Sequence, residues 1–313
     1  MAATLDDVLS TTLEKYVSTE VRDNIFDSLA LFFLLKSKAR SVNGGTYLEE
    51  PIMGGKSSAT GSYSGYDQLS VTAQQGIAKA EFNWKQYYAS IVLDGLSEHQ
   101  NMGDTAMLDL LEIKANQARM SLKDVMCTDA YGDGTGNGSK ALDGLAIAID
   151  SAGTYGGISR TTSTWWSANE TAVSGALTLA RMRTMWNNCS AGGAQGGTEH
   201  PDLILTTQAI YEFYEALLQP DQRFQNTKLA DGGFANLEFK GTGIVWDESC
   251  TADTVYFVNS HYLNLKFHAK RNFSSRPFQT PVNQDAKVSL ILWLGNVTGS
   301  NGRRQGKLTG VTS

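Results

Sequence analysis

The chain has 313 residues, of which 41% are hydrophobic and 19% are charged, and its formal net charge is -6. This composition is that of a globular protein with a sizeable core. The acidic balance argues against a dedicated nucleic-acid binder, which would normally carry a basic face. Small basic groups at residues 36–40, 266–271 and 303–307 are better explained as solvated faces or subunit salt bridges than as phosphate contacts.

The three cysteines, Cys127, Cys189 and Cys250, are odd in number and far apart. They offer neither a disulfide framework nor a paired-cysteine metal site, so buried thiols are expected. The longest wholly apolar run, residues 29–35, is far shorter than the roughly 20 residues that cross a bilayer. The N-terminus lacks the basic patch and apolar stretch of a signal peptide. We therefore expect a soluble chain, made in a cytoplasm, with no membrane partner.

Two amphipathic segments open the chain. Leu5, Leu9 and Leu13 recur at helical spacing within residues 4–20, and a second apolar segment with basic residues near its end follows over residues 21–40. Together they predict an N-terminal arm that must bury one face on something else.

Residues 44–70 are rich in Gly and Ser, contain few large apolar side chains and show no helical repeat. The next segment alternates, with Ala78, Ala80, Phe82 and Trp84 on one face and polar residues on the other, which is typical of a strand. With residues 46–51 as the outgoing strand and 71–86 as the return, we expect a hairpin reaching about 50 to 65 Å. Two strands alone are marginal in water, so the hairpin is expected to bury itself on another molecule.

The remaining elements are mixed. Residues 104–127 predict the clearest long helix, with Leu122, Val125 and Met126 on its apolar stripe. Further helices are expected over residues 171–188 and 208–218, and strands over residues 202–207, 243–247, 254–259, 262–270 and 288–295. The order lacks a regular βαβ rhythm and predicts an α+β fold.

No catalytic constellation is complete. Residues 54–58, "GGKSS", imitate the end of a Walker loop, but Glu50 stands where that motif needs Gly. Residues 133–144 imitate a calcium loop, yet end in Gly144 instead of a bidentate Glu. Trp165 and Trp166 could stack on bases or sugars, although core packing is the preferred interpretation. We expect no enzyme, no metal and no cofactor.

The order of these parts, together with "PDLILTTQAIYEFYEALLQPDQRF", "FKGTGIVWDES" and "TVYFVNSHYLNLKFHAKRNF", resembles the tailed-phage major capsid proteins of the Hong Kong 97 fold. The resemblance spans nearly the whole chain. It implies an N-terminal arm at residues 1–43 and an extended β-hairpin loop at 44–90. It also implies a peripheral domain with a long spine helix at 91–199 and 261–313, and an axial domain at 200–260.

The resemblance implies a chain that self-assembles into hexamers and pentamers of an icosahedral shell around a double-stranded DNA phage genome. The shell would be assembled in the host bacterial cytoplasm and become part of the virion. Expected partners are a portal, a separate scaffolding protein, packaged DNA in weak contact, and a decoration protein. Two alternatives stay open: an encapsulin-type compartment that encloses a cargo enzyme, and an enzyme of carbohydrate or nucleotide chemistry.

The resemblance also suggests which residues contact neighbouring subunits: Leu5, Leu9, Leu13, Tyr47, Glu49, Glu50, Lys56, Tyr63 and Tyr66. Some relatives join subunits by an isopeptide bond from a loop lysine to an asparagine. Here Lys56 with Asn283 or Asn296 would be the candidates, and a solvated Lys56 is the preferred interpretation.

Overall fold

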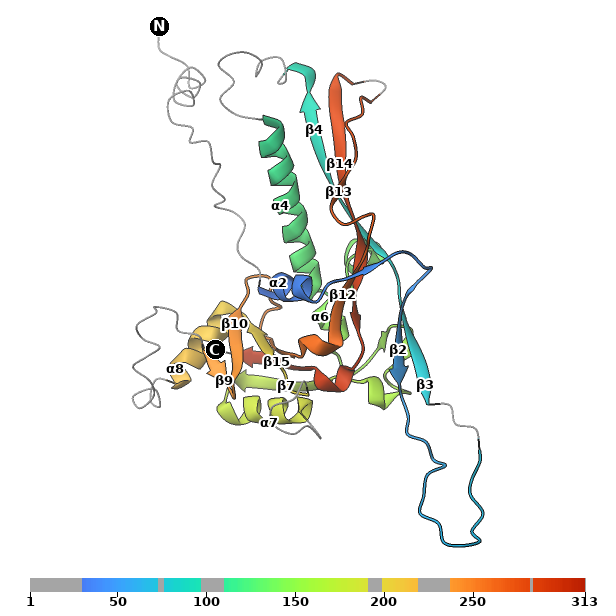
Figure 1. Ribbon diagram of the computed structural model, residues 1–313. Helices are drawn as coiled ribbons and strands as arrows, with labels where there is room; N and C mark the ends of the chain where they lie inside the picture. Colours follow the sequence, from blue (N-terminus) through green and yellow to red (C-terminus); the bar gives the residue numbers. More distant parts are fainter. Residues whose placement is uncertain are drawn as a thin grey trace. The chain divides into compact units, whose positions relative to one another are not determined.

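In the computed structural model, the described residues are 30–72, 76–96, 110–190, 199–218, 237–281 and 284–312. The chain divides into two compact units (Figure 1). The first unit comprises residues 1–28, 86–126 and 270–293, and the second comprises residues 29–85, 127–269 and 294–313. Leu5, Leu9 and Leu13 of the expected arm lie outside the described residues.

The first unit is built from strands and one long helix. β14 (Ala286–Gly299) pairs with β4 (Lys85–Asp94) and with β13 (Ser274–Ser275). Side chains of β4 alternate between buried and exposed, and the buried Tyr87 ring lies edge-on to Trp293 at 5.9 Å. The period-two pattern in this segment is therefore a true strand signal.

The predicted long helix is confirmed as α4 (Leu110–Tyr131), although it ends later than residue 127. Leu122, Met126 and Ala130 are buried at four-residue intervals. Val125 was expected on this stripe, but its side chain is 51% exposed. The buried stripe is narrow, and Val125, three positions after Leu122, falls outside it.

The second unit contains a six-stranded sheet in the order β7-β15-β11-β8-β10-β9. Its strands are β7 (Asn169–Ala176), β8 (Leu203–Thr206), β9 (Glu238–Phe239), β10 (Thr242–Trp246), β11 (Val255–Val258) and β15 (Gly306–Thr312). Two neighbouring pairs are parallel and three are antiparallel. This mixed sheet and its helices confirm the α+β prediction.

Two helices pack against this sheet, α7 (Leu179–Cys189) and α8 (Gln208–Leu218). In α7 the side chains of Met182, Met185, Trp186 and Cys189 follow the helical repeat and are all buried. They join Ile204, Phe257, Leu308 and Val311 of the strands in one hydrophobic core. The core therefore brings together residues that are far apart in the sequence, from Val173 to Val311.

The helix expected over residues 171–188 is wrong in its first part. Residues 169–176 form β7, which pairs in parallel with β15 with a shift in register between Thr309 and Val311, and Thr178 then caps α7. Long-range pairing with β15 decides the structure here, and the β-branched Thr171 and Val173 suit a strand.

Other elements of the second unit are short. β12 (Leu263–His268) lies between β1 (Arg40–Val42) and the second half of β14 and pairs with both. Helix α2 (Ala30–Ser37) buries Leu31 and Leu35. The remainder are α5 (Gly136–Ser139), α6 (Leu145–Ala148), β5 (Thr154–Tyr155), β6 (Ile158–Ser159) and 3-10 turns at Thr164–Trp166, Ser260–Tyr262 and Gly302–Arg304.

The predicted hairpin is confirmed, but the long strand ladder is wrong. β2 (Leu48–Met53) and β3 (Ile77–Phe82) pair antiparallel over six residues each, from Leu48 opposite Phe82 to Met53 opposite Ile77. Residues 54–72 form no strand, because Gly and Ser are poor strand formers. Trp84 also lies outside the predicted alternation, since β3 ends at Phe82 and β4 begins at Lys85.

Candidate functional site

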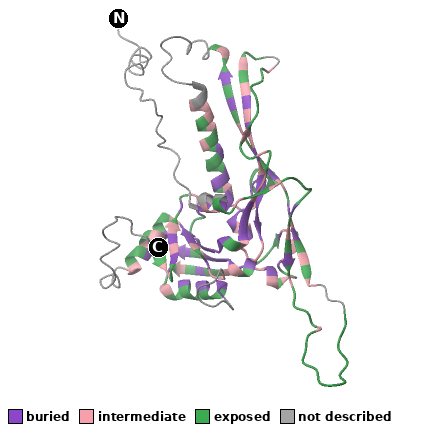
Figure 2. Ribbon diagram, in the orientation of Figure 1, coloured by how far each residue is buried: buried purple, intermediate pink, exposed green. Residues whose placement is uncertain are grey.

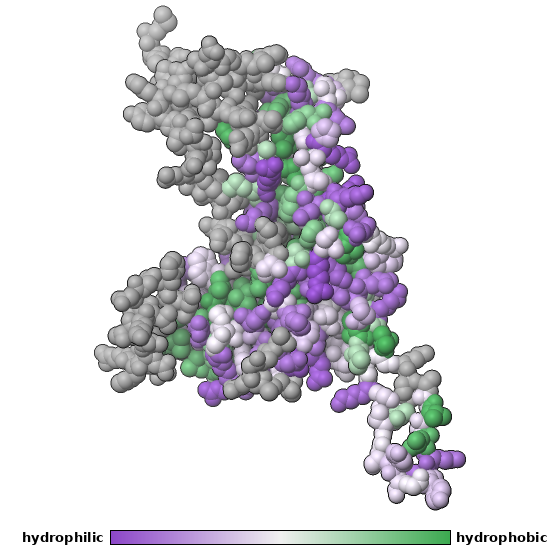
Figure 3. All heavy atoms as spheres, in the orientation of Figure 1, coloured by the Kyte–Doolittle hydropathy of each residue, from purple (hydrophilic) through white to green (hydrophobic). Residues whose placement is uncertain are grey.

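The extended loop, residues 54–76, joins β2 to β3; residues 73–75 lie outside the described part. Tyr63, Tyr66, Leu69 and Val71 are between 60% and 106% exposed. Figure 2 shows the loop as exposed, and Figure 3 shows hydrophobic residues on its surface. Its hydrogen bonds are local, such as Ser64 N to Asp67 Oδ2 at 2.8 Å. The described loop residues therefore have no apolar core within the second unit.

The sequence-predicted contact residues separate into two groups. Tyr47, Lys56, Tyr63 and Tyr66 are exposed on the hairpin and its loop, where a partner could reach them. Glu49 and Glu50 point to opposite sides of β2, as adjacent strand residues must. Their surroundings differ accordingly.

Glu50 faces inward and fixes the base of the hairpin. Its Oε1 lies 2.8 Å from Lys266 Nζ and accepts a hydrogen bond from Thr298 Oγ1 at 2.9 Å. Lys266 Nζ also donates to the backbone oxygen of Glu49 at 2.9 Å. The Glu50 carboxylate is thus engaged within its own chain.

Glu49 faces outward beside the exposed Lys79. Lys79 Nζ lies 3.2 Å from Glu49 Oε1 and 2.6 Å from Glu81 Oε1. Hydrogen bonds to Glu81 and then to Glu49 raise the pKa of Lys79 above its ordinary value. This cross-strand pairing leaves a mixed-charge face on the outside of the hairpin.

The hairpin also rests on aromatic residues of the second unit. Gly54 N donates to Gly76 O at 2.8 Å, and a Cβ at Gly54 would lie 2.5 Å from the Trp165 ring. Trp166 is buried, and its Nε1 donates to Tyr155 O at 2.9 Å. The core-packing interpretation of this tryptophan pair is therefore confirmed for Trp166. Trp165 is half-buried against the loop base.

A second contact of the same kind involves Gly156. Its carbonyl accepts a hydrogen bond from Glu81 N at 2.9 Å, and an added Cβ would lie 2.8 Å from Ala80 Cβ. Phe82 meets the Tyr155 ring edge-on at 4.9 Å. Sequence reasoning missed Gly156 and Tyr155 as supports of the hairpin, because nothing local in residues 155–156 marks their distant partners.

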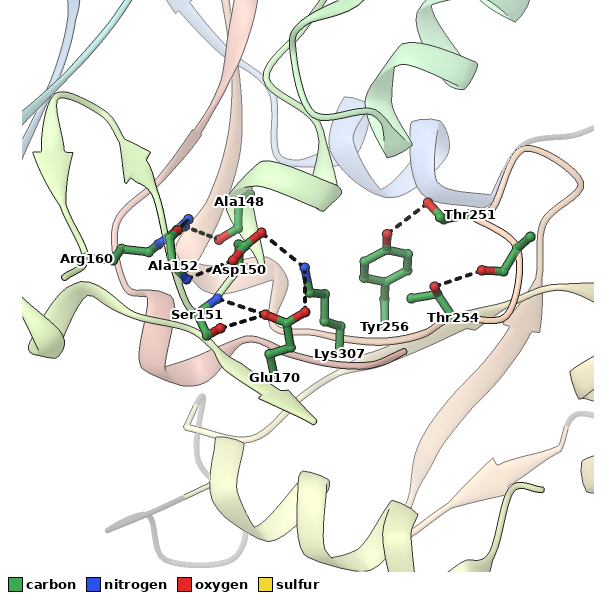
Figure 4. A network of polar contacts seen from close by, with 11 residues as sticks. Ala148, Asp150, Ser151, Ala152, Arg160, Glu170, Thr251, Thr254, Tyr256 and Lys307 are labelled. Atoms are coloured by element: carbon green, nitrogen blue, oxygen red, sulfur yellow. Dashed lines mark hydrogen bonds and ion pairs between the residues drawn. The ribbon is translucent and has the colours of Figure 1, made fainter. Parts of the chain in front are cut away.

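A network of polar contacts surrounds Lys307, near the start of β15 (Figure 4). The buried Lys307 Nζ lies 3.3 Å from Asp150 Oδ2 and 3.2 Å from Glu170 Oε1. Glu170 Oε2 in turn accepts hydrogen bonds from the backbone nitrogen and hydroxyl of Ser151. Arg160 donates to the carbonyls of Ala148 and Ala152, and burial lowers its pKa. These groups join β7, β15 and the segment before β5.

Three of the basic side chains noted in the sequence form ion pairs within the chain. Lys266 binds Glu50, Lys307 binds two carboxylates, and Arg304 forms an ion pair with Glu199. These side chains are engaged and form no free phosphate-binding cluster.

Asn296 is fully buried, and both atoms of its amide are used. Nδ2 donates to Asn83 O at 2.9 Å and to Asp143 Oδ2 at 2.7 Å. Burial and these contacts within the chain disfavour the suggested pairing of Asn296 with Lys56, which stays a prediction. Asn283 lies outside the described residues.

The first unit carries a groove of about 550 Å³ between β4 and α4. Tyr88 and Val92 of β4 and Val125 of α4 line it and are all at least 46% exposed. Lys114 Nζ donates to Val92 O at 3.1 Å across the groove. The groove thus offers apolar side chains beside an ammonium group, a surface suited to a protein segment.

Chemically reactive groups are sparse in the part of the chain that the structure describes. All three cysteines are buried, as predicted. No group of three or more His, Cys, Asp or Glu side chains in that part is placed to hold a metal ion. His200 stacks on Trp186 at 4.8 Å, which is a packing role. In the same residues, the helices are too short or too polar to span a bilayer.

The hairpin with its exposed loop, the long helix beside a narrow sheet, and the six-stranded sheet with two helices define the Hong Kong 97 capsid fold. Solved structures share it over nearly the whole chain. The cyanophage A-1(L) capsid subunit has a TM-score of 0.70 at 17% identity, covering 97% of this chain and 98% of that chain. The capsid of the native GTA particle has a TM-score of 0.63 at 14% identity, covering 99% and 100%.

The same fold occurs in a protein compartment. The holo-SrpI encapsulin of Synechococcus elongatus has a TM-score of 0.64 at 9% identity, covering 99% of this chain and 96% of that chain. No protein-family model matches the sequence, and no curated protein matches it. At these identities the likeness establishes the fold.

Proposed function

We propose that this chain is the major capsid protein of a tailed phage, a structural protein that assembles into hexamers and pentamers of an icosahedral shell. The main support for this proposal is the exposure of the large side chains of the extended loop, which pack against no apolar core of their own unit. A capsid fold that covers 97% of the chain supports the same function. A loop of this kind becomes buried when another copy covers it.

The receiving surface on the neighbouring copy is the groove between β4 and α4. Its apolar lining matches the Tyr63, Tyr66 and Leu69 side chains of the loop, and its volume of about 550 Å³ can hold several of them. Each contact is modest, but many neighbours bind at once and the shell becomes stable collectively.

We assign the axial domain to the six-stranded sheet with α7 and α8. This assignment keeps residues 200–260 and adds β7, α7 and β15, which share its core. The peripheral domain then centres on α4, β4 and β14. The hairpin of β2 and β3, with the extended loop between them, is the part of the second unit that we propose to contact a neighbouring copy.

The remaining partners follow from the same function. A portal and a separate scaffolding protein take part in assembly in the host bacterial cytoplasm, and the shell becomes part of the virion. Packaged double-stranded DNA is contacted weakly, which agrees with the net charge of -6 and the internal pairing of Lys266 and Lys307. A decoration protein can bind the outer face.

A loop deletion tests this function. Removing residues 57–69 keeps the Gly54–Gly76 hydrogen bond and the contact with Trp165. We expect a soluble chain that forms no closed particles in electron microscopy, while the Gln68→Ser variant, altered at an exposed polar loop position, assembles as the unchanged chain does. Normal shells from the deletion variant would contradict the role of the loop. A compact monomer from the unchanged chain at high concentration would contradict the capsid function.

The encapsulin-type compartment is the second candidate, because the SrpI encapsulin shares the fold. Isolation of particles from the native source separates the two: packaged double-stranded DNA supports the phage shell, and an enclosed enzyme supports the compartment.

A further inference from the structure

Three side chains that the assembly function does not use meet inside the second unit. They are Lys85 at the start of β4, Asp143 just before α6, and Asn296 in β14. Asn296 is 0% exposed and Lys85 is 8% exposed. An amine, a carboxyl group and a carboxamide therefore share one site from which water is largely excluded.

The carboxamide of Asn296 is held in a defined orientation. Its Oδ1 accepts hydrogen bonds from Asp143 N at 3.0 Å and from Val297 N at 2.8 Å. Its Nδ2 donates to Asp143 Oδ2 and to Asn83 O, and a carboxylate and a carbonyl can only accept from it. Two backbone N–H groups aimed at the amide oxygen are the arrangement that stabilises an oxyanion during acyl transfer.

Asp143 connects the amide to the amine. Its Oδ2 lies 2.7 Å from Asn296 Nδ2, and its Oδ1 lies 3.4 Å from Lys85 Nζ. Lys85 Nζ is also held by Ser139 O at 2.8 Å. The Asp143 carboxylate is therefore placed to take a proton from Lys85 Nζ as the amine attacks. The flexible four-carbon stem of lysine allows that amine to approach the amide carbon.

We propose that Lys85 and Asn296 form an intrachain isopeptide bond. The Lys85 amine attacks Cγ of Asn296, and the Nζ–Cγ bond forms as negative charge develops on Oδ1 between the N–H groups of Asp143 and Val297. Asp143 then donates the proton that it took from Lys85 to Nδ2, and the Cγ–Nδ2 bond breaks. The second Nζ proton passes to the released ammonia, which leaves as ammonium. The step therefore needs no oxidant, reductant or co-reactant.

This bond lies within one subunit and differs from a contact between subunits. It closes a ring between β4 and β14, two strands that are far apart in the sequence. The inference is independent of the proposed function, because it concerns the folded chain before and after assembly. A covalent tie between distant strands stabilises a chain against unfolding by restricting its unfolded state.

Intact-mass spectrometry of the full chain tests the proposal. The unchanged chain is expected to be lighter than its sequence mass by one ammonia, and digestion is expected to yield a branched peptide that joins Lys85 to Asn296. Lys85→Arg keeps the positive charge beside Asp143 but removes the reactive amine. Lys85→Arg and Asn296→Ala are each expected to have their full sequence mass, and Asp143→Ala to retain most of its chains at full mass.

Asparagine can also lose ammonia by cyclising onto its own backbone, so the lysine variant is the deciding control. Loss of ammonia that persists in Lys85→Arg would overturn the proposal. So would full sequence mass in the folded, unchanged chain after prolonged incubation. A branched peptide mapped to Lys85 and Asn296, absent from Lys85→Arg, would establish the bond even if a variant proves less stable.

Discussion

Glu50 Oε1 and Lys266 Nζ lie 2.8 Å apart, with side chains only 14% and 12% exposed. The pair joins β2, at the base of the hairpin, to β12, and Thr298 of β14 supports it with a hydrogen bond. A shielded ion pair of this kind fixes the base of the hairpin against β12 and β14, because breaking it leaves a shielded charge without a partner.

The Lys266→Met variant is expected to loosen the hairpin. Loss of the ammonium removes one of the two partners of the Glu50 carboxylate, at a cost of about 1 to 3 kcal/mol in the free energy of unfolding. Faster amide hydrogen exchange in β2 and β3 would show the effect locally. Lys79→Met, which removes an exposed ion pair on the same hairpin, is the matched control and should change little. Equal effects of the two substitutions would contradict a special role for Glu50 and Lys266.

Gly54→Ala tests the close contact at the loop base. The new methyl group would lie 2.5 Å from the Trp165 ring, so the ring or the backbone must move. Overpacking of this kind costs about 1 to 3 kcal/mol. Chemical denaturation measures this cost. Gly61→Ala, where the Cβ meets open space, is expected to be neutral.

A double variant separates packing from backbone strain at this position. Trp165→Ala removes the obstructing ring, so Gly54→Ala is expected to cost less in that background than in the unchanged chain. Identical costs in both backgrounds would show that the ring is not what restricts residue 54.

The sequence predicts the elements whose signals are local. Helix α8 begins and ends where its hydrophobic repeat does, and the strands around Ile204 and Phe257 follow from short apolar runs. Strand β7 is missed because its conformation depends on pairing with β15, more than a hundred residues later in the sequence. Strand alternation correctly indicates the opposite directions of Glu49 and Glu50.

In the candidate site, too, the sequence predicts local properties but not the distant contacts. Exposure of Tyr63 and Tyr66 follows from a segment too poor in apolar residues to fold on itself. The partners of Glu50 and Gly54 could not be predicted, since Lys266 and Trp165 are far away in the sequence and carry no shared motif. A single sequence gives the chemistry of a side chain, and the fold determines its neighbour.

Lys307→Met is expected to destabilise the second unit strongly. Lys307 Nζ forms ion pairs with both Asp150 and Glu170, so the substitution takes this cation from two carboxylates at once. Because the carboxylates of Asp150 and Glu170 are 36% and 24% exposed, solvent screens part of the loss, and we expect a cost of about 1 to 3 kcal/mol. Thermal unfolding measures the change, and Arg303→Met, at an exposed position nearby, is the control. An unchanged melting temperature in Lys307→Met would show that the network of Figure 4 contributes nothing to stability.

Cys189 and Cys250 are expected to be unreactive in the folded chain. Burial raises the pKa of each thiol to about 12, chiefly by disfavouring the thiolate. At pH 9 roughly three quarters of an ordinary exposed thiol is ionised, whereas on the order of one in a thousand of these two thiols would be. Alkylation by iodoacetamide, followed by mass spectrometry, should therefore be at least about 100-fold slower at these two residues than in urea.

The raised pKa of these two thiols also determines whether the free energy of unfolding rises or falls at high pH. Below the ordinary thiol pKa both states are protonated and these cysteines do not affect stability. As the pH rises from about 9 toward 12, the unfolded chain releases protons that the folded chain retains, so the free energy of unfolding falls across that interval. Urea titrations at pH 8 and pH 10 measure this loss. A Cys250→Ser variant, which keeps a small side chain that does not ionise in this range, should lose less stability between the two. An identical loss in the variant would mean that the Cys250 thiol is not the group that responds.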